Sequence, residues 1–304
     1  MRVLLKIWKL LTDKKYRFNI LASRGFYNHW SDEKYLKHKF KLEMGYDLNL
    51  NHPQTFSEKL QWLKLHDHNP LYTIMVDKEK AKEYVANIIG SKYIIPTLGV
   101  WDKFEDIDFD KLPTQFVLKT THDSGGVFIC KNKEDFDIHA ARLKLEKSLK
   151  RNFYYQGREW PYKNVKPRII AEKYMEDTSS SELKDYKLFC FNGKHKCTYV
   201  CTDRFTKDGL KITFYDPHWE IMPFERHYPR SKTRIEKPSN YYEMVELAEK
   251  LSKNIPFVRV DFYSIVGQTY FGELTFFPGS GMRKFNPSKW DYTLGSWIKL
   301  GESI

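Results

Sequence analysis

The spacing of apolar residues changes along the chain, and near residue 116 it changes from helical to strand-like. Up to about residue 75, aromatic and aliphatic residues recur every three or four positions, as in SDEKYLKHKFKLEMG and TFSEKLQWLKLHD. This spacing predicts amphipathic helices. Thr55 followed by Glu58 fits a capping box, so one helix is expected to begin near Phe56. The segment VDKEKAKEYVANIIG predicts a further helix that ends at Gly90.

From Phe116 onward, short runs rich in β-branched and aromatic residues predict strands. These runs are FVLKT, GVFIC, RIIAEKYM, YKLFCF, KCTYVCT, LKITFYD, FVRVDFYSI and TYFGELTFF. Helical spacing returns in DFDIHAARLKLEKSLK and YYEMVELAEKLSK. Because most strands follow one another as hairpins, the order favours an α+β fold with antiparallel sheets over a parallel doubly wound fold.

Two segments outside these runs carry separate expectations. KYIIPTLGVW contains Pro96 and Gly99, which are typical of an edge strand rather than a central one. Residues 216–240 form the only long irregular stretch and are expected to be a mobile flap.

Composition narrows the classes of partner. The chain has 51 Lys and Arg against 39 Asp and Glu, a net charge of +12, so its partners are expected to be anionic. A nucleic acid is not expected, because the lysines are scattered and no RNP, KH or zinc-finger pattern occurs. None of the four cysteines lies in a C-x-x-C pair, which indicates a reduced cytoplasmic protein without a zinc site.

The first residues, MRVLLKIWKLLTDKKYRF, are both apolar and basic. Lysines interrupt the apolar run and no cleavage site follows, so export is not expected. In a helix, one side would be shared by Val3, Leu4, Ile7, Leu10 and Leu11, with Trp8 near its border. Basic residues flank that side, which predicts peripheral contact with the inner face of the membrane; a helix packed on the core is the alternative.

The segment QFVLKTTHDSGGVFIC places a strand ending at Lys119 before a polar loop that contains Gly125 and Gly126. Small residues let backbone N–H groups approach phosphates, and an ammonium group neutralises them. The segment is not a Walker A loop, because it lacks the G-x-x-x-x-G-K-[ST] pattern. Taken alone, the segment is better explained by an ordinary hairpin turn that happens to contain two glycines.

The segment FVRVDFYSIVGQTYFGELTFFPG predicts a hairpin that turns around Gly267. Arg259 and Asp261 are two residues apart, as are Glu273 and Thr275, so each pair shares a face. A turn centred on Gly267 places Asp261 opposite Glu273, and facing carboxylates require a positive charge between them, such as a hard cation. A register shifted by half a step would place Gly272 opposite Asp261 instead.

Two further segments complete the pattern. RIIAEKYMEDTSSSELKDYKLFCFNGK predicts a strand, a polar loop and a second strand that begins at Asp185. Asp77 and Lys78 stand at the head of a predicted helix. In isolation each is an ordinary structural feature.

Together, in order and spacing, these four segments resemble the ATP-grasp superfamily from about Asp77 to Gly279, with a motif layout similar to that of D-alanine–D-alanine ligases. The segments HDSGG, DYKLFCFNGK and GELTFFPGSG resemble those of the TupA-like branch, whose members belong to teichuronopeptide and capsular polysaccharide biosynthesis. The resemblance implies ATP and Mg²⁺ as cofactors. It differs at Thr275, where the superfamily has an asparagine that binds a second metal ion.

The resemblance also implies roles for individual residues. Those implied to hold ATP phosphates are Lys78, Lys119, Ser124, Gly125 and Gly126. Those implied to border adenine are Glu172, Lys173, Tyr174 and Met175, with Asp185 at the ribose. Magnesium would be held by Asp261, Glu273 and Thr275, while the catalytic cations would be Arg259, Lys187 and Arg204.

The implied organisation is an ATP-grasp fold in which antiparallel sheets and flanking helices sandwich ATP. Its parts would be a helical region at 1–75, a linker helix and N-lobe segment at 76–115, a first subdomain with the phosphate loop at 116–172, and a second subdomain with the magnesium hairpin at 173–304.

The implied reaction joins a carboxylate, expected on a uronic acid of a surface polysaccharide or its precursor, to an amino acid or amino alcohol through an acyl phosphate. Two alternatives are weighed against it. Asp106, Asp108 and Asp110 have the D-x-D spacing of a glycosyltransferase metal site, and a sugar kinase would share ATP and magnesium.

Overall fold

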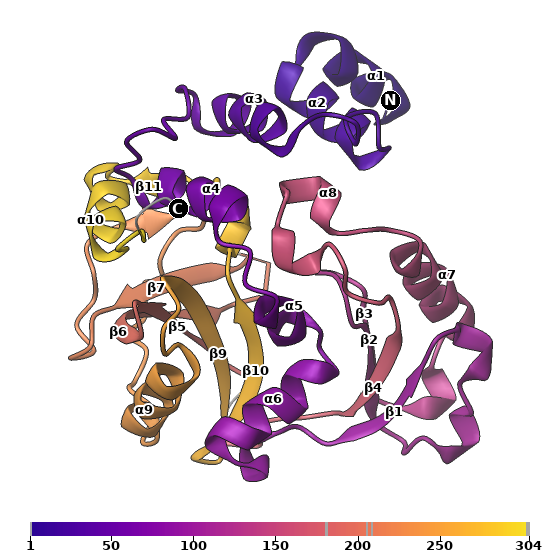
Figure 1. Cartoon of the computed structure of the whole chain (residues 1–304). Coiled ribbons are helices and arrows are strands. Elements are labelled where there is room, and N and C mark those ends of the chain that lie inside the picture. The colour runs from indigo at the N-terminus through magenta and orange to yellow at the C-terminus, as the bar shows by residue number, and fades with distance from the viewer. Residues whose placement is uncertain (1, 180–181, 205, 208, 302–304) are drawn as a thin grey trace.

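The computed structural model describes residues 2–179, 182–204, 206–207 and 209–301. Its N-terminal helices, at the top of Figure 1, lie apart from the sheets. They are α1 (Arg2–Thr12), α2 (Lys14–Ser23) and α3 (Asp32–Met44). These helices enclose an apolar core of their own, which includes Phe18, Tyr35 and Phe40. Among the described residues, no helix is long and apolar enough to cross a membrane.

Three helices connect this region to the first sheet: α4 (Phe56–His66), α5 (Leu71–Val76) and α6 (Lys80–Ile89). Thr55 and Glu58 form both hydrogen bonds of a capping box, which confirms the predicted start of α4. α6 ends before Gly90, whose φ of +106° is in the region that favours glycine.

The first sheet is antiparallel and has the order β1-β4-β2-β3. Its strands are β1 (Thr97–Trp101), β2 (Phe116–Thr120), β3 (Val127–Cys130) and β4 (Ile169–Lys173). The predicted edge position of β1 is confirmed. One face of this sheet is covered by α7 (Ile138–Leu149), through a core that includes Phe116 and Leu145. The short helix α8 (Tyr154–Gly157) follows α7 and lies near α2 (Figure 1).

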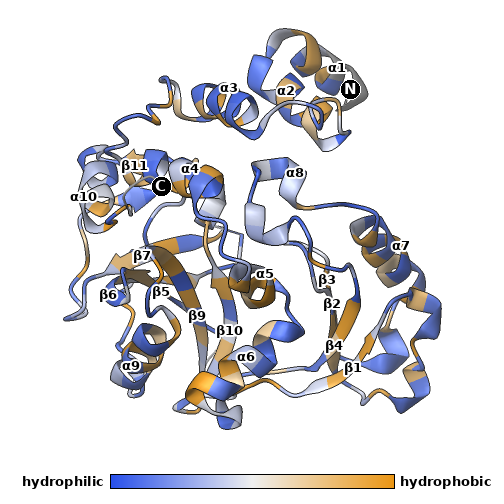
Figure 2. Ribbon diagram, viewed as in Figure 1, coloured by the Kyte–Doolittle hydropathy of each residue, from blue (hydrophilic) through white to orange (hydrophobic). Residues whose placement is uncertain are grey.

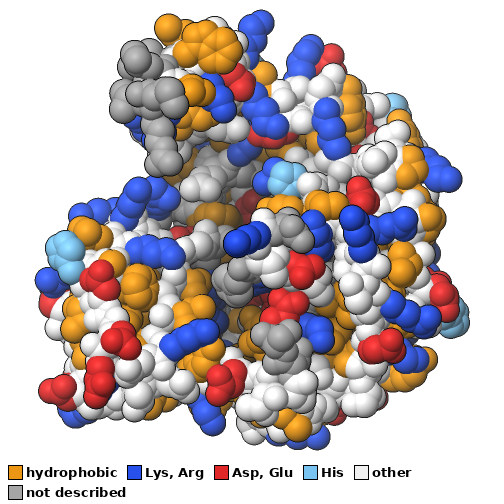
Figure 3. Space-filling view, turned by 180° about the vertical axis from the view of Figure 1, so that it is seen from behind, with side chains coloured by type: hydrophobic (Ala, Val, Ile, Leu, Met, Phe, Trp, Pro, Cys, Tyr) orange, Lys and Arg blue, Asp and Glu red, His pale blue; other side chains and the backbone are white. Residues whose placement is uncertain are grey.

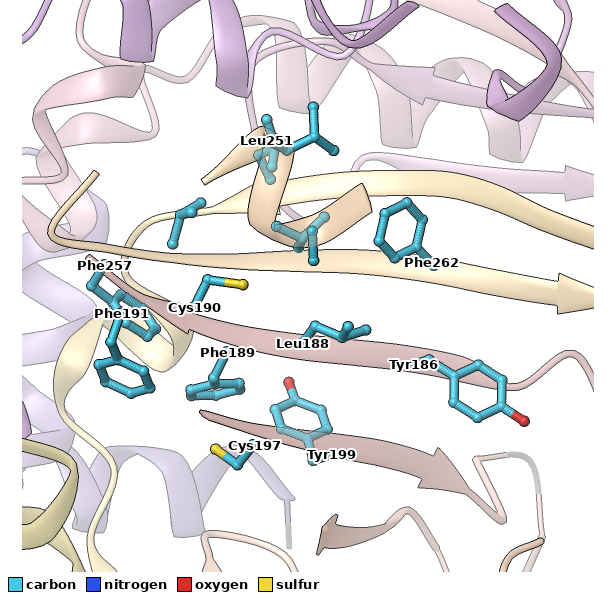
Figure 4. Close-up of a cluster of buried hydrophobic side chains, with 14 of the residues drawn as sticks. Tyr186, Leu188, Phe189, Cys190, Phe191, Cys197, Tyr199, Leu251, Phe257 and Phe262 are labelled. Atoms are coloured by element: carbon cyan, nitrogen blue, oxygen red, sulfur yellow. The ribbon is translucent and has the colours of Figure 1, made fainter. Parts of the chain in front are cut away.

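The second sheet is also antiparallel, with the order β10-β9-β5-β6-β7. Its strands are β5 (Asp185–Phe191), β6 (Lys194–Thr202), β7 (Lys211–Tyr215), β9 (Phe257–Ile265) and β10 (Gln268–Thr275). α9 (Tyr241–Leu251) packs against it, and the largest apolar core lies around this sheet. Figure 4 shows Leu188, Phe262 and Leu251 within this core, and Figure 2 shows the long hydrophobic runs of its strands.

The predicted α+β class with antiparallel sheets is confirmed. The expectation of a flap at residues 216–240 is wrong. This segment buries Trp219, Met222, Phe224 and Ile235, and it contains β8 (Glu225–Arg226), which pairs with β11 (Phe285–Asn286) ahead of α10 (Lys289–Trp297). Widely spaced apolar residues therefore hold an otherwise polar segment on the core.

Candidate active site

A cavity of about 1040 Å³ lies between the two sheets and is bordered by α5 and α6. Its walls include eleven of the residues proposed from the sequence: Lys78, Lys119, Glu172, Lys173, Tyr174, Met175, Asp185, Lys187, Arg204, Asp261 and Glu273. Its apolar lining includes Met75, Val117, Phe271 and Leu274, side chains against which a flat aromatic base could pack. Arg259, Thr275 and the segment 124–126 are not part of the lining.

The β9–β10 hairpin places Asp261 opposite Glu273, as expected for the register centred on Gly267. Near the turn, however, Phe271 faces Phe262, which follows the other register. The two registers meet at a β-bulge at Gly272. A Cβ atom at Gly272 would lie 3.1 Å from the carbonyl oxygen of Asp261, so the close approach of the two strands favours glycine at this position.

Arg259 supplies the positive charge between the facing carboxylates. Its Nε and Nη2 donate to the two oxygens of Asp261 at 2.6 Å each, and Nη2 also donates to Glu273 Oε1 at 2.9 Å. Nη2 reaches Thr275 Oγ1 at 2.9 Å, and Nη1 reaches the hydroxyl of Tyr199 at 3.1 Å. Tyr199, on β6, has no place in the sequence pattern, and only its register opposite the predicted Lys187 could have indicated it.

Lys187 is a second cation at the same carboxylates. It lies opposite Asp261 across β5 and β9, and its ammonium group donates to Asp261 Oδ2. Desolvation within the cavity opposes ionisation of Glu273, but the charges of Lys187, Arg259 and Lys78 hold its pKa well below its ordinary value. Glu273 is therefore an anion at neutral pH.

The donor set of this hairpin fits magnesium. Asp261 and Glu273 offer carboxylate oxygens and Thr275 offers a hydroxyl, all of them hard oxygen donors. Within the part of the chain that the structure describes, no cluster of three or more His, Cys, Asp and Glu could hold a metal. Two carboxylates are nevertheless sufficient, because Mg²⁺ usually takes its remaining ligands from water and nucleotide phosphates.

Glu172 joins two lysines on the wall formed by the first sheet. Its Oε2 accepts from Lys119 and its Oε1 from Lys82. Burial alone raises the pKa of Glu172, but the two ammonium groups together hold it below its ordinary value. Lys82 also lines the cavity and was missed in the sequence. Its spacing of four residues from Lys78, which stands at the head of the helix predicted from the sequence, is the signal that could have identified it.

Asp185 is held between two cations at the start of β5. Lys187 Nζ lies 3.7 Å from its Oδ2, and Arg204 donates to the same oxygen. Burial opposes ionisation, yet these cations hold the pKa of Asp185 below its ordinary value. All three residues predicted here are thus brought together.

Lys78 is tied to the loop between β2 and β3. Its ammonium group donates to the carbonyl oxygen of Asp123, and burial lowers its pKa. The Asp123 carboxylate accepts from Thr120 and Ser148, which fixes the loop from both sides. Ser124 and Gly125 are exposed on this loop. A Cβ atom at Gly126 would lie 1.9 Å from Thr120 Oγ1, so tight packing requires glycine there.

Asp106, Asp108 and Asp110, the D-x-D residues, are exposed on short 3₁₀ turns away from the cavity. Asp108 pairs with Lys111 at 3.0 Å. The glycosyltransferase alternative therefore loses the feature on which it depended.

The cavity thus lies between two antiparallel sheets. Lys78 and Lys119 line one side of it, and the carboxylates of the β9–β10 hairpin line the other, an arrangement typical of an ATP-grasp protein. The chain belongs to the TupA-like ATP-grasp family, whose model matches residues 58–299. No curated protein matches the chain.

Several solved structures are similar to the chain. D-alanine–D-alanine ligase from Bacillus anthracis, complexed with ATP, is 17% identical over 66% of this chain and 53% of its own length, with a TM-score of 0.38. The enzyme from Helicobacter pylori is 16% identical over 80% of this chain and 69% of its own, with a TM-score of 0.42. The ATP-grasp ligase PsnB, complexed with minimal precursor, Mg and ADP, is 10% identical over 85% and 66%, with a TM-score of 0.41. The chain thus spans about half of the Bacillus anthracis ligase.

Proposed function

We propose that the protein is an ATP- and magnesium-dependent carboxylate–amine ligase that acts in the cytoplasm. The observation that carries this proposal is the opposition of Asp261 and Glu273 across β9 and β10, in a cavity whose other walls present Lys78 and Lys119. Such an arrangement suits a nucleotide polyphosphate held between ammonium groups and a divalent ion.

The roles of the side chains follow from their charges. Lys78 and Lys119 bind phosphate oxygens of ATP, while the linker 172–175 borders the base and Asp185 the ribose. Asp261, Glu273 and Thr275 would hold Mg²⁺, which neutralises the phosphates when it is bound. Arg259 orients the carboxylates of Asp261 and Glu273. Together with Lys187 and Arg204, it stabilises the negative charge that develops during phosphoryl transfer.

The reaction has two balanced steps. A substrate carboxylate oxygen attacks the γ-phosphorus of ATP and ADP leaves, which gives an acyl phosphate. An amine then attacks the acyl carbon, inorganic phosphate leaves with the C–O electron pair, and the amine loses a proton to give an amide. No side-chain nucleophile is needed, because positioning and charge neutralisation lower both barriers.

We propose a uronic acid of a bacterial surface polysaccharide, or of its nucleotide-linked or lipid-linked precursor, as the carboxylate. The amine is an amino acid or amino alcohol. The net charge of +12 supports a polyanionic partner, and the resemblance of HDSGG, DYKLFCFNGK and GELTFFPGSG to the TupA-like branch suggests the pathway.

The test is to incubate the protein with ATP, Mg²⁺ and pools of uronic acids and amines, and to measure ADP and product mass. A product heavier by the amine minus water supports the ligase. A product heavier by one phosphate would instead show a kinase.

A further inference from the structure

The N-terminal helices lie outside the residues that the family model matches. The family match begins at residue 58, whereas α1, α2 and α3 lie before it and enclose a separate apolar core. Residues 1–50 contain eleven Lys and Arg but only five Asp and Glu. This sixth of the chain therefore carries half of the net charge of +12.

Hydrogen bonds fix α1 against α2. Asp13 caps the start of α2 by accepting from the backbone N–H of Tyr16 at 2.9 Å. From within α2, Arg17 donates to the last carbonyl groups of α1, including that of Leu11 at 2.9 Å. The orientation of α1 relative to α2 is therefore set by the cap at the junction residue Asp13 and by Arg17 of α2.

That orientation leaves three large apolar side chains in solvent. Leu5 is 51% exposed, Trp8 62% and Leu11 70%. They recur every three residues and lie on one side of α1. The membrane-facing side expected from the sequence is thus partly wrong: Leu10 is half-buried and Leu5 takes its place, while the side chains of Val3, Leu4 and Ile7 lie outside the described residues.

We propose that this face, Leu5, Trp8 and Leu11, docks the protein on an anionic lipid bilayer. Lys6, Lys9 and Lys14 are exposed around it, and Figure 3 shows basic and hydrophobic side chains side by side on the N-terminal part of the surface. Apolar side chains enter the interface, tryptophan favours its boundary, and lysines attract anionic headgroups. A second copy of the chain fits this face less well, because the lysines around the face of one copy would repel the same lysines of the other.

The experiment compares flotation of the full-length protein with vesicles of neutral phospholipid and with vesicles containing about one third anionic phospholipid. One variant carries Trp8→Glu and Leu11→Glu. Its matched control carries Ile138→Glu and Leu143→Glu, which change two exposed apolar residues of α7 and the charge by the same amount. Nucleotide binding and sedimentation velocity are measured for all three proteins.

We expect the wild type and the control to float only with anionic vesicles, and less so as salt is raised. The Trp8/Leu11 variant should bind the vesicles about tenfold or more weakly, because each substitution removes an apolar side chain that would be buried in the bilayer interface. Its nucleotide affinity should be unchanged. Equal flotation of both variants, flotation with neutral vesicles alone, or no flotation of the wild type would overturn the proposal. A lower sedimentation coefficient for the Trp8/Leu11 variant than for the wild type, without lipid, would overturn the proposal and show a self-association face instead.

Discussion

Asp261 has a buried side chain whose charge is matched by two cations. It is 2% exposed and is bound by Arg259 and Lys187, whereas Glu273 is exposed. Asp261→Asn should therefore leave two cations without their partner and lower the free energy of unfolding by about 3 kcal/mol. Glu273→Gln should change it by less than about 1 kcal/mol. Both variants should lose magnesium-dependent release of ADP.

Denaturant unfolding and ADP release, measured on the same preparations, separate these effects. If Asp261→Asn were as stable as Glu273→Gln, the pairing of Asp261 with Arg259 and Lys187 would not be what stabilises the hairpin. Normal turnover in either variant would show that the hairpin does not hold the metal.

Lys119 is the ammonium group whose removal tests nucleotide binding most directly. In the variant Lys119→Ala, Glu172 still forms its ion pair with Lys82, so its carboxylate is not left without a cation. Losing one charge-assisted contact to phosphate should raise the Kd for ATP about tenfold or more. Lys111→Ala, on the exposed 3₁₀ turn, is the control and should bind ATP normally. Isothermal titration calorimetry gives both values, and equal affinities would contradict the assignment.

Lys64 predicts a pH dependence of stability. Burial lowers the pKa of this lysine from 10.5 to about 7, although its ammonium group donates to Gln61 and Ser280. Between these pH values the unfolded chain holds a proton that the folded chain has lost, so this group makes stability rise with pH. The rise is at most about 1.4 kcal/mol per pH unit.

Lys64→Met removes this contribution. The difference in unfolding free energy between wild type and Lys64→Met, measured by urea denaturation from about pH 7 to about pH 9, should move in favour of the wild type. Parallel curves for the two proteins would show that Lys64 has the same pKa folded and unfolded.

Among the elements, the β2–β3 loop depends on close packing at Gly126. A Cβ atom there would meet Thr120 Oγ1 at 1.9 Å and Ser148 Oγ at 2.7 Å. Gly126→Ala should therefore displace the hydrogen bonds that hold Asp123, lower unfolding free energy by about 1–3 kcal/mol and weaken ATP binding through Lys78. Ser124→Ala, at an exposed position of the loop, should leave stability unchanged. Thermal unfolding with and without ATP measures both, and equal stability of the two variants would contradict the packing argument.

The sequence predicts elements better than it predicts their irregularities. The capping box at Thr55, the edge strand β1 and the hairpin strands were all predictable, because each rests on local periodicity or turn chemistry. The bulge at Gly272 was not, because it reconciles two registers that local sequence leaves equal. The packing of residues 216–240 was missed since its buried aromatics are too widely spaced to show a period.

The site shows the same division. Eleven of the residues named from motifs line one cavity. Lys82 and Tyr199 were missed because their roles depend on partners about 90 and 60 residues away, Glu172 and Arg259. Such pairs are set by the fold rather than by neighbours in the chain.

At the scale of the whole molecule, charge is divided between two tasks. The cavity pairs its cations with carboxylates, Lys187 with Asp261 and Lys119 with Glu172, so little net charge remains there without ligand. The N-terminal helices instead hold half of the net charge on the surface. A nucleotide is thus expected to bind by replacing internal ion pairs, and a polyanionic surface by direct attraction.

The reaction itself is tested by the chemistry of its intermediate. An acyl phosphate is a mixed anhydride, so hydroxylamine added in place of the amine should trap it as a hydroxamate, with ADP and phosphate and never AMP and pyrophosphate as by-products. The proposed site predicts this outcome because Lys78 and Lys119 would hold the polyphosphate, while Asp261 and Glu273 of the hairpin would hold the magnesium that neutralises it. A phosphoester made by a kinase would not react with hydroxylamine. Reducing the substrate's carboxylate to an alcohol should abolish ADP formation, measured by a coupled assay and mass spectrometry. If the alcohol is phosphorylated instead, the enzyme is a kinase and the ligase proposal is wrong.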